Sequence, residues 1–276
     1  MVDEVLSDRF IEVGGLRTRY REAGAGTPTL LIHGAPLGSS AEDWADVLGP
    51  LAEAGLRVIA LDQPGYGLTD NPSDFTVDFR QNFFLDFLSA LGIDRANWIG
   101  HSQAGGMVAN IALMHSGRVS KAVIAATGSM LPPMPHQAKG ATERDMEFTT
   151  DPTAQQVRQL LAGHVWNDRV LTPERVARYR ELCLGKNMAF LKARRASDVS
   201  GVAKPANDIP FWKQLDKLPV PMRFIYGVHD RNHTAVRAAL AIDYCPDADI
   251  QMVENAKHLI HWDAPEAFVS HVVRFL

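Results

Sequence analysis

The sequence predicts an α/β protein in which a mostly parallel β-sheet is covered by helices on both faces. Short continuous apolar runs recur along the chain and alternate with stretches of helical periodicity, which is typical of buried parallel strands joined through helices. The pattern breaks between about residues 131 and 205, where charged helical sequence contains no good strand. We therefore expect a helical insertion between two strands of the sheet.

The strand predictions rest on alternation at the start of the chain and on apolar runs after it. Residues 9–24 alternate β-forming residues around Gly14-Gly15, which indicates a hairpin. The later strands are expected in short apolar runs, several of them ended by Gly or Pro. These runs are 27–34, 56–65, 97–100, 120–128, 220–227 and 249–254.

Helices are expected between these strands. Ser39 and Glu42 fit a capping box, which predicts a helix from there to about Ala54. In the next helix Phe79 and Phe83 begin an apolar stripe at helical spacing. Asp263 and the proline after it are expected to open the last helix. The remaining predicted helices cover 76–93, 103–116, about 234–243, and the C-terminal end to residue 276.

These elements divide the chain into a core and an inserted cap. The core is expected to comprise residues 1–130 and 206–276, and the cap residues 131–205. A helical insertion of this size is too short for an independent catalytic domain but is suited to a lid over a site.

Composition narrows the class of protein. At 276 residues and 46% hydrophobic content the chain can bury one large core. A formal net charge of −4 does not indicate a nucleic acid or an anionic membrane as partner. Cys183 and Cys245 do not form a disulfide framework or a metal motif. With no signal-peptide pattern at the N-terminus and no apolar run near about 18 residues, we expect a cytoplasmic protein without membrane span, metal or cofactor.

The string GHSQAG, residues 100–105, places a serine between a predicted strand and a predicted helix. A nucleophile elbow needs small residues on both sides of its serine, and Gly100 and Ala104 occupy those positions. The alternative is a serine that only caps a helix at a tight turn. The strand before and the helix after it favour Ser102 as a nucleophile.

A serine nucleophile needs a base, and the base needs an orienting acid. Asp230 follows the predicted strand 220–227, and His258 follows the last predicted strand. Because loops at the carboxyl ends of parallel strands share one edge of the sheet, we expect these two residues to meet Ser102. The histidines that compete for the role of base are His101, His229 and His261; Asp62 competes as the acid.

Backbone N–H groups are expected to stabilise the oxyanion that forms during attack on a carbonyl. Gln103, directly after the serine at a helix N-terminus, supplies one of them. Ala35, in the loop LIHGAP after the first buried strand, supplies the other. His33 and Asp62 are interpreted as structural residues.

Five motifs in this order resemble the α/β-hydrolase superfamily over essentially the whole chain: LIHGAP, LDQPGYGLTD, IGHSQAGG, YGVHD and AKHLIHWDAPEAF. The resemblance implies an α/β-hydrolase fold with a cap and no cofactor. Dehalogenases and epoxide hydrolases of this fold carry aspartate at the elbow, whereas the serine here implies an esterase or a C–C bond hydrolase.

The cap segment VWNDRVLTPERVARYREL is similar to the cap of meta-cleavage product hydrolases, which cleave C–C bonds of ring-fission keto acids in aromatic degradation. In that group an arginine before an aromatic residue faces the substrate carboxylate, which implies this role for Arg178. Its alternative is a solvated position on a helix. Trp166 and His261 are expected as further substrate contacts.

Two positions differ from that group. The loop HGAPLGSS replaces a glycine-rich string, and Leu259 follows the base where tryptophan is usual. The function expected is therefore C–C hydrolysis of a small, largely apolar carbonyl compound, with carboxylester or lactone hydrolysis as the alternative. A ligand-binding protein on a hydrolase scaffold is the alternative of another class. The partner expected is a small-molecule substrate, and a homodimer stays open.

Overall fold

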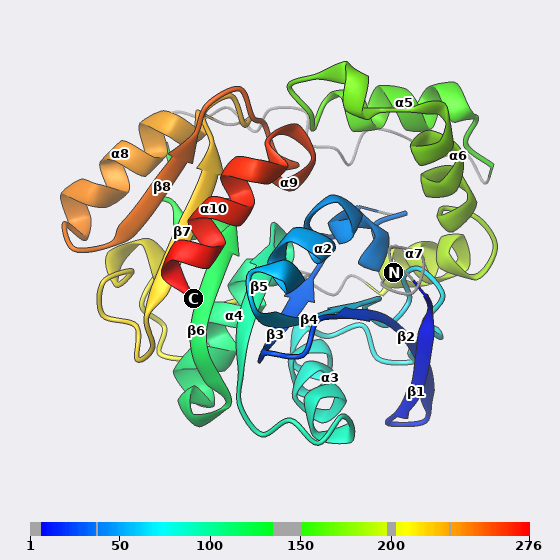
Figure 1. The fold of residues 1–276 in the computed structure, drawn as a ribbon, viewed down its shortest axis with the longest axis horizontal. Helices are drawn as coiled ribbons and strands as arrows, with labels where there is room; N and C mark the ends of the chain where they lie inside the picture. Colours follow the sequence, from blue (N-terminus) through cyan, green and yellow to red (C-terminus); the bar gives the residue numbers. More distant parts are fainter. Residues whose placement is uncertain (1–6, 37, 135–150, 198–202, 232) are drawn as a thin grey trace.

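The computed structural model describes residues 7–36, 38–134, 151–197, 203–231 and 233–276. In these residues eight strands form one sheet in the order β1-β2-β4-β3-β5-β6-β7-β8 (Figure 1). The first two strands are antiparallel to their neighbours, and the strands from β4 to β8 pair in parallel. The strands are β1 Arg9–Val13, β2 Leu16–Ala23, β3 Thr27–Ile32, β4 Leu56–Leu61, β5 Ala96–His101, β6 Val119–Ala125, β7 Met222–Gly227 and β8 Asp249–Val253. The predicted α/β fold with a mostly parallel sheet is confirmed.

Helices cover both faces of this sheet. The apolar cluster on one face combines sheet residues with α3, α4 and α8, and the cluster on the other face combines them with α2 and α10. Because both faces are covered, β3 to β7 are largely buried, which explains their nearly continuous apolar sequence. The helix bounds are α2 Ala45–Glu53, α3 Val77–Ala90, α4 Gln103–Met114, α8 Thr234–Tyr244 and α10 Pro265–Phe275.

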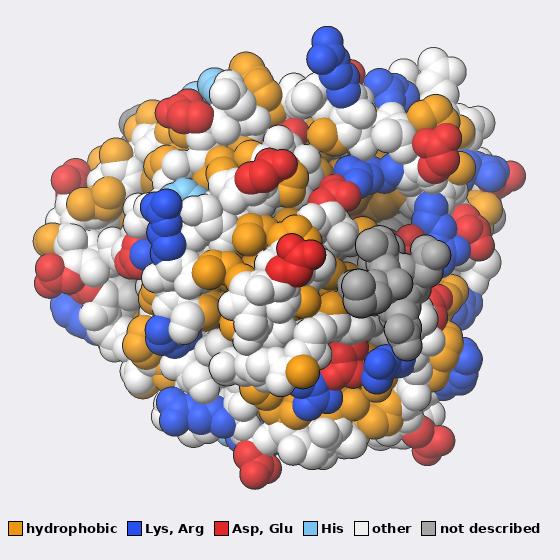
Figure 2. Space-filling view, viewed as in Figure 1, with side chains coloured by type: hydrophobic (Ala, Val, Ile, Leu, Met, Phe, Trp, Pro, Cys, Tyr) orange, Lys and Arg blue, Asp and Glu red, His pale blue; other side chains and the backbone are white. Residues whose placement is uncertain are grey.

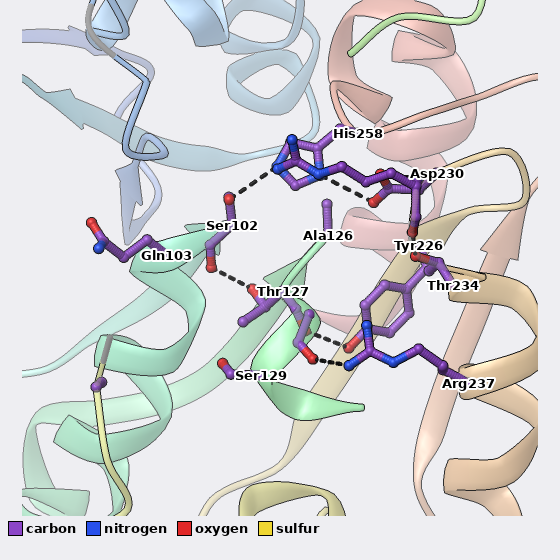
Figure 3. A pocket seen from close by; sticks show the side chains of 13 residues that line it. Ser102, Gln103, Ala126, Thr127, Ser129, Tyr226, Asp230, Thr234, Arg237 and His258 are labelled. Carbon is purple, nitrogen blue, oxygen red and sulfur yellow. Dashed lines mark hydrogen bonds and ion pairs between the residues drawn. The ribbon is translucent and has the colours of Figure 1, made fainter. Parts of the chain in front are cut away.

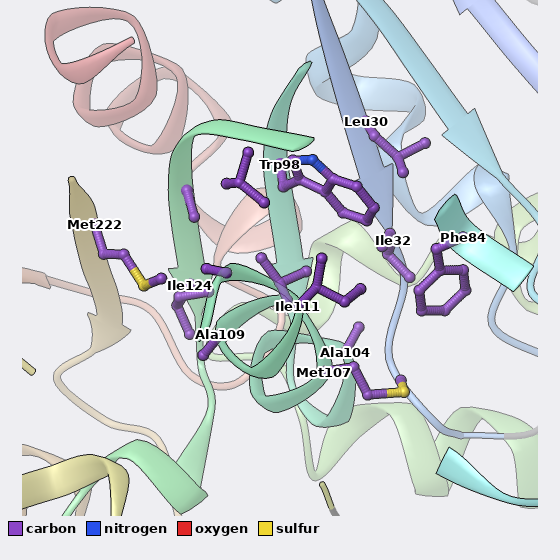
Figure 4. Packing of buried hydrophobic residues seen from close by; sticks show 14 of the residues in the cluster. Leu30, Ile32, Phe84, Trp98, Ala104, Met107, Ala109, Ile111, Ile124 and Met222 are labelled. Atoms are coloured by element: carbon purple, nitrogen blue, oxygen red, sulfur yellow. The ribbon is translucent and has the colours of Figure 1, made fainter. Parts of the chain in front are cut away.

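The larger of the two clusters lies beneath β5, the strand that leads to Ser102. Figure 4 shows Trp98 of β5 packed among Leu30 and Ile32 of β3, Phe84 of α3 and Met107 of α4. All five side chains are fully buried. Full burial of such side chains contributes about 1.5–3 kcal/mol each to folding, so this cluster fixes β5 and α4 relative to each other.

In the described residues between β6 and β7, three α-helices occur: α5 Ala154–Ala162, α6 Pro173–Leu182 and α7 Lys186–Ala196. Figure 1 shows them to one side of the sheet and its covering helices. They form an apolar cluster of their own that also includes Leu259 and Trp262 of the core. The described residues of the insertion are thus helical, as expected, while its boundaries at 131 and 205 stay predictions.

Two helix starts differ from the sequence prediction. Ser40, and not Ser39, caps the segment after β3, since its side chain accepts from the backbone N–H of Glu42. That segment begins as a 3₁₀ turn, η1 Ala41–Trp44, and becomes α-helical only at Ala45. At the C-terminus Asp263 ends a short helix, α9 Ile260–Asp263, and its carboxylate accepts from Trp166, Asn167 and Lys257 N–H groups instead of capping α10.

Surface charge, helix length and the grouping of possible metal ligands give three further findings. Figure 2 shows Lys and Arg side chains interspersed with Asp and Glu over the face in view. Among the described residues, no helix is both long and apolar enough to cross a membrane. Within the same ranges no three His, Cys, Asp or Glu side chains are grouped so that they could hold a metal ion.

Candidate active site

The site lies at the carboxyl ends of β3 and β5. The chain passes from β3 to β4 on one side and later returns to β5 on the other side of β3. Such a reversal opens a crevice at the carboxyl edge of the sheet, where ligands bind in open α/β folds. Gly34 follows β3 in this crevice and Ser102 follows β5.

Ser102 stands on a strained turn between β5 and α4. Its φ of 55° and ψ of −121° lie outside the regions that serine ordinarily adopts. Gly100 is required because a Cβ there would lie 2.8 Å from the Cα of Gly105. The turn is held by the Ser102 N–H, which donates to Ala125 O at 2.8 Å, and by Thr127 Oγ1, which donates to Ser102 O at 2.8 Å. These contacts match the predicted elbow and explain how the strain is maintained.

The structure brings Ser102, His258 and Asp230 together in one chain of hydrogen bonds (Figure 3). Ser102 Oγ lies 2.9 Å from His258 Nε2, and His258 Nδ1 lies 3.0 Å from Asp230 Oδ2. The side chains of Asp230 and His258 are both 5% exposed. Asp230 Oδ1 also accepts from the backbone N–H of Arg231 at 2.7 Å, which fixes the carboxylate.

Burial sets the protonation of this pair. It lowers the pKa of His258 well below 6.5, with Arg231 and His164 adding to the effect. It raises the pKa of Asp230 to about 7, while the backbone N–H of Arg231 opposes the rise. A neutral imidazole that donates from Nδ1 to Asp230 leaves Nε2 as an acceptor for the serine hydroxyl, which is the state a general base requires.

The competing histidines lie elsewhere. His101 supports the base, because its Nε2 donates to the backbone oxygen of His258 at 2.9 Å. His229 stacks on Trp166 at a ring distance of 3.9 Å. His261 is fully buried against Trp44 with the rings 4.5 Å apart. Its ring nitrogens have no hydrogen-bond partner within the described part of the chain. His261 therefore lies in the core. It does not line the cavity beside Ser102, although the sequence predicted that it contacts the substrate.

A cavity of about 210 Å³ opens beside the Ser102 hydroxyl. Asp230 and His258 line this cavity with Ser102. The other polar side chains of the lining are Gln103, Thr127, Ser129, Tyr226, Thr234, Arg231 and Arg237. Arg237 donates to the backbone oxygens of Gly128, Leu131 and Pro132, so its donors are engaged in structure. Arg231 approaches the base directly.

The two expected oxyanion donors lie near the nucleophile. Gln103 begins α4 and lines the cavity. A Cβ at Gly34 would lie 3.2 Å from Ser102 Cβ, so the loop that continues into Ala35 passes against the serine. Tyr66 Oη donates to Ala35 O at 2.9 Å and orients that residue. The roles of Ala35 and Gln103 stay predictions.

Arg178 and Trp166 are not brought to this cavity. Arg178 lies in a second cavity of about 230 Å³ between α6 and the segment after β3. Its guanidinium pairs with Glu42 at 2.6 Å and Glu181 at 2.8 Å. Trp166 is 46% exposed, and its backbone N–H donates to Asp263. Glu42 also pairs with Arg19 and Arg21, and the expected role of Arg178 toward a substrate carboxylate stays a prediction.

Asp62 and His33 serve the framework, as interpreted from the sequence. Asp62 is fully buried and accepts from Arg19 Nη1 at 3.2 Å and from the backbone N–H groups of Ala41 at 2.6 Å and Leu68 at 2.7 Å. Burial lowers the pKa of His33 to about 3, and its Nε2 accepts from the N–H of Gln63 at 3.1 Å. These bonds hold the loops after β3 and β4 in place.

Sequence reasoning missed Thr127, Arg231 and His164. Arg231 directly follows the predicted acid, and this adjacency was the available signal. Thr127 lies just after β6, but no neighbouring residue in the sequence indicates its hydrogen bond to the Ser102 carbonyl. His164 belongs to the insertion, and no motif links it to the site.

A sheet of this topology with a serine elbow at its carboxyl edge is the architecture of α/β-hydrolase enzymes. A family model described as the alpha/beta hydrolase fold matches residues 27–265. The chain belongs to this family and is a hydrolase that acts on a small-molecule substrate.

Relatives and solved structures share nearly the whole length. The chain is 26% identical over 273 residues to 2-hydroxy-6-oxo-6-(2'-aminophenyl)hexa-2,4-dienoic acid hydrolase of Metapseudomonas resinovorans, covering 98% of this chain and 90% of the relative. It is similar in fold to the meta-cleavage product hydrolase CumD from Pseudomonas fluorescens IP01, with a TM-score of 0.77, 22% identity and coverage of 97% and 96%. The enol-lactonase from Burkholderia xenovorans LB400 follows at a TM-score of 0.73, 21% identity and coverage of 97% and 99%. At these identities the two structures establish the fold alone.

Proposed function

We propose that the protein is a serine hydrolase that cleaves a C–C bond beside a carbonyl group in a ring-fission keto acid of aromatic degradation. The observation that carries the serine mechanism is the hydrogen-bonded chain from Ser102 through His258 to Asp230, at 2.9 and 3.0 Å. The substrate class is supported by the name of the relative that covers most of the chain, a hydrolase of a hydroxy-oxo-dienoic acid.

In this mechanism Ser102 Oγ attacks the carbonyl carbon while its proton passes to His258 Nε2. Asp230 stabilises the imidazolium, and the N–H groups of Ala35 and Gln103 donate to the oxyanion. The C–C bond then breaks, and the departing carbon takes the proton from His258. A water molecule, deprotonated by the same base, hydrolyses the acyl group, which releases a carboxylic acid and restores Ser102.

Ester or lactone hydrolysis is the second candidate. The resemblance in fold to an enol-lactonase supports it, and the same residues would act in the same order on an ester oxygen as leaving group. The position of Arg178, paired with two carboxylates outside the Ser102 cavity, does not favour an acidic substrate over a neutral one.

Ser102→Ala tests the mechanism common to both candidates. We expect hydrolysis of a ring-fission dienoate and of 4-nitrophenyl esters to fall by several orders of magnitude, with circular dichroism and thermal midpoint unchanged. Loss of labelling by a fluorophosphonate probe would accompany it. A wild-type protein that neither labels nor turns over would favour a ligand-binding protein. A variant that kept more than about a tenth of the activity would contradict the role of Ser102.

The relative rates on the dienoate and the esters decide between the two candidates. We expect kcat/KM for the dienoate to exceed that for simple esters. The reverse ranking would support an esterase or lactonase.

A further inference from the structure

Tyr66 lies in the loop after β4, between the helical insertion and the loop that is expected to supply an oxyanion donor. Its side chain is 1% exposed. Its hydroxyl donates to the backbone oxygen of Ala35 at 2.9 Å. The guanidinium of Arg194, in α7 of the insertion, donates from Nη1 to the same hydroxyl at 3.0 Å. Two hydrogen bonds in series thus join the insertion to Ala35.

Helix α7 packs on the loop that carries Tyr66. A Cβ at Gly65 would lie 2.5 Å from the Phe190 ring, so this ring rests against the backbone of the loop. The rings of Phe190 and Tyr66 meet edge to face, with their centroids 5.5 Å apart. Asn187 Nδ2 donates to Gly67 O at 2.9 Å. The position of Tyr66 therefore depends on where α7 lies.

Arg194 fixes the direction in which the Tyr66 hydroxyl donates. A guanidinium has donors and no acceptor, so the hydroxyl can only accept from it. The single phenolic proton is then left for Ala35 O. A charged donor on one side of a hydroxyl also polarises it and strengthens the hydrogen bond that it makes on the other side. Loss of this cation would therefore weaken the hold on Ala35 without removing any atom that Ala35 contacts.

The backbone of Ala35 has little freedom once its carbonyl is held. Pro36 follows it, which restricts Ala35 to extended backbone conformations. On the other side, Gly34 O accepts from His33 Nδ1 at 2.8 Å, and Nδ1 carries the proton because Nε2 of this ring accepts a hydrogen bond. In a trans peptide the Ala35 N–H points away from the Gly34 carbonyl. The peptides on both sides of the Ala35 Cα are thus anchored, and the bond from Tyr66 helps to aim the N–H.

We propose that Tyr66 is a positioning residue of the oxyanion site and that Arg194 makes the helical insertion act on it. Tyr66 holds Ala35 so that its N–H meets the developing oxyanion, and Arg194 directs the Tyr66 proton to Ala35. This inference rests on the proposed function, since it takes Ser102 as the nucleophile and the Ala35 N–H as an oxyanion donor. Through this chain α7 affects the rate of attack on the carbonyl more than the binding of the substrate.

Tyr66→Phe removes the hydroxyl and keeps the ring that packs on Phe190. We expect kcat for 4-nitrophenyl butyrate to fall about 5- to 30-fold with KM within about twofold, because the oxyanion forms only after binding. The loss should be smaller than the roughly 10²- to 10³-fold that follows when an oxyanion donor is removed outright. Circular dichroism and thermal melting check that the fold is kept.

A double-mutant cycle tests whether Arg194 acts through the Tyr66 hydroxyl. Arg194→Ala alone should lower kcat about 3- to 10-fold. Combined with Tyr66→Phe it should lower kcat by less than about twofold more, because the hydroxyl that it acts on is already gone. Arg195→Ala removes the same charge from the next, exposed position of α7 and is the matched control, with kcat expected to be unchanged.

An inhibitor separates positioning from a general loss of structure. The trifluoromethyl ketone 1,1,1-trifluoro-4-phenylbutan-2-one forms a hemiketal with a serine nucleophile, and its oxyanion lies where that of the transition state forms. Its Ki should rise in Tyr66→Phe and in Arg194→Ala by about the factor by which kcat/KM falls. The Ki of 4-phenylbutan-2-one, which has the same chain and stays a ketone, should remain within about twofold.

The outcomes separate this inference from the function beneath it. Additive losses in the double variant, or equal losses in Arg194→Ala and Arg195→Ala, would overturn the role of Arg194. An unchanged Ki of the trifluoromethyl ketone in Tyr66→Phe, or a raised KM with unchanged kcat, would overturn the role of Tyr66. Activity retained in Ser102→Ala would instead contradict the proposed function, whereas the other outcomes leave that function standing.

Discussion

At the scale of single residues, the arrangement of the site depends on a few side chains in loops that follow strands of the sheet. Ser102, Asp230 and His258 could be predicted because each follows a recognisable strand, and the carboxyl ends of parallel strands share an edge. The position of Arg178 could not, since its partner Glu42 lies 136 residues away in the chain. The contact of Arg231 with His164 could not be predicted either, because His164 lies in the insertion, 67 residues away in the chain.

Two aspartates should separate chemistry from stability. Asp230→Asn keeps the size of the side chain but favours the wrong tautomer of His258, so kcat should fall by up to about 10⁴-fold with little change in thermal midpoint. Asp62→Asn weakens the buried pair with Arg19 and should cost about 3 kcal/mol of unfolding free energy while the folded enzyme keeps most of its kcat. Kinetics and thermal melts of both variants are compared, and the opposite pattern would place the acid on another strand.

The pH dependence follows from the pair Asp230 and His258. Burial disfavours charge on both, with the pKa of the carboxyl raised to about 7 and the pKa of the imidazole lowered. The coupled pair takes up its first proton as a unit, and a protonated pair cannot accept the proton of Ser102. We expect kcat/KM for a neutral ester to be flat above about pH 7.5 and to fall at lower pH with a limiting slope of about tenfold per unit. If kcat/KM already begins to fall above pH 8 as the pH is lowered, the protonation of the Asp230–His258 pair does not set the pH dependence.

At the scale of elements, apolar runs predicted the strands because each run is buried on both faces. Helix starts were harder to predict from the sequence, because they depend on which backbone N–H group a side chain accepts a hydrogen bond from. Ser40 caps η1 through Glu42 N–H, where Ser39 was expected to cap. Asp263 was expected to open the last helix, but its carboxylate binds backbone N–H groups of the insertion and of the loop before His258.

Asp263 therefore links the insertion to the loop that carries His258. Its Oδ2 accepts from Lys257 N–H at 2.9 Å, next to the base, and its Oδ1 accepts from Trp166 and Asn167 N–H. Asp263→Ala should cost about 2 kcal/mol of stability and speed amide hydrogen exchange at these three positions. It should also lower kcat/KM, because the loop that carries His258 loses a restraint. Asp168→Asn, at an exposed site of the insertion, is the control, and equal exchange in both variants would show that Asp263 holds neither segment.

At the scale of the whole molecule, the core and the insertion differ in how they are stabilised. The sheet lies between two large apolar clusters, whereas α5 to α7 share one small cluster with Leu259 and Trp262. Absence of apolar runs predicted a helical insertion, but its docking could not be read from the sequence. Docking depends on ion pairs such as that of Arg175 with Asp46 at 2.6 Å, which join residues 129 positions apart.

This difference predicts that the insertion opens before the core unfolds. Local opening is easiest where few apolar groups are buried, so amides of α5 and α6 should exchange faster than those of β3 to β7. Arg175→Gln removes the pair with Asp46 and the contact of its guanidinium with the Trp262 ring. A partly exposed pair of this kind contributes about 0.5–1 kcal/mol, so exchange in α6 should rise about two- to fivefold while exchange in β5 is unchanged. Hydrogen exchange read by mass spectrometry measures both segments in one sample. Equal protection of α6 and β5 in the wild type would mean that core and insertion unfold as one cooperative unit.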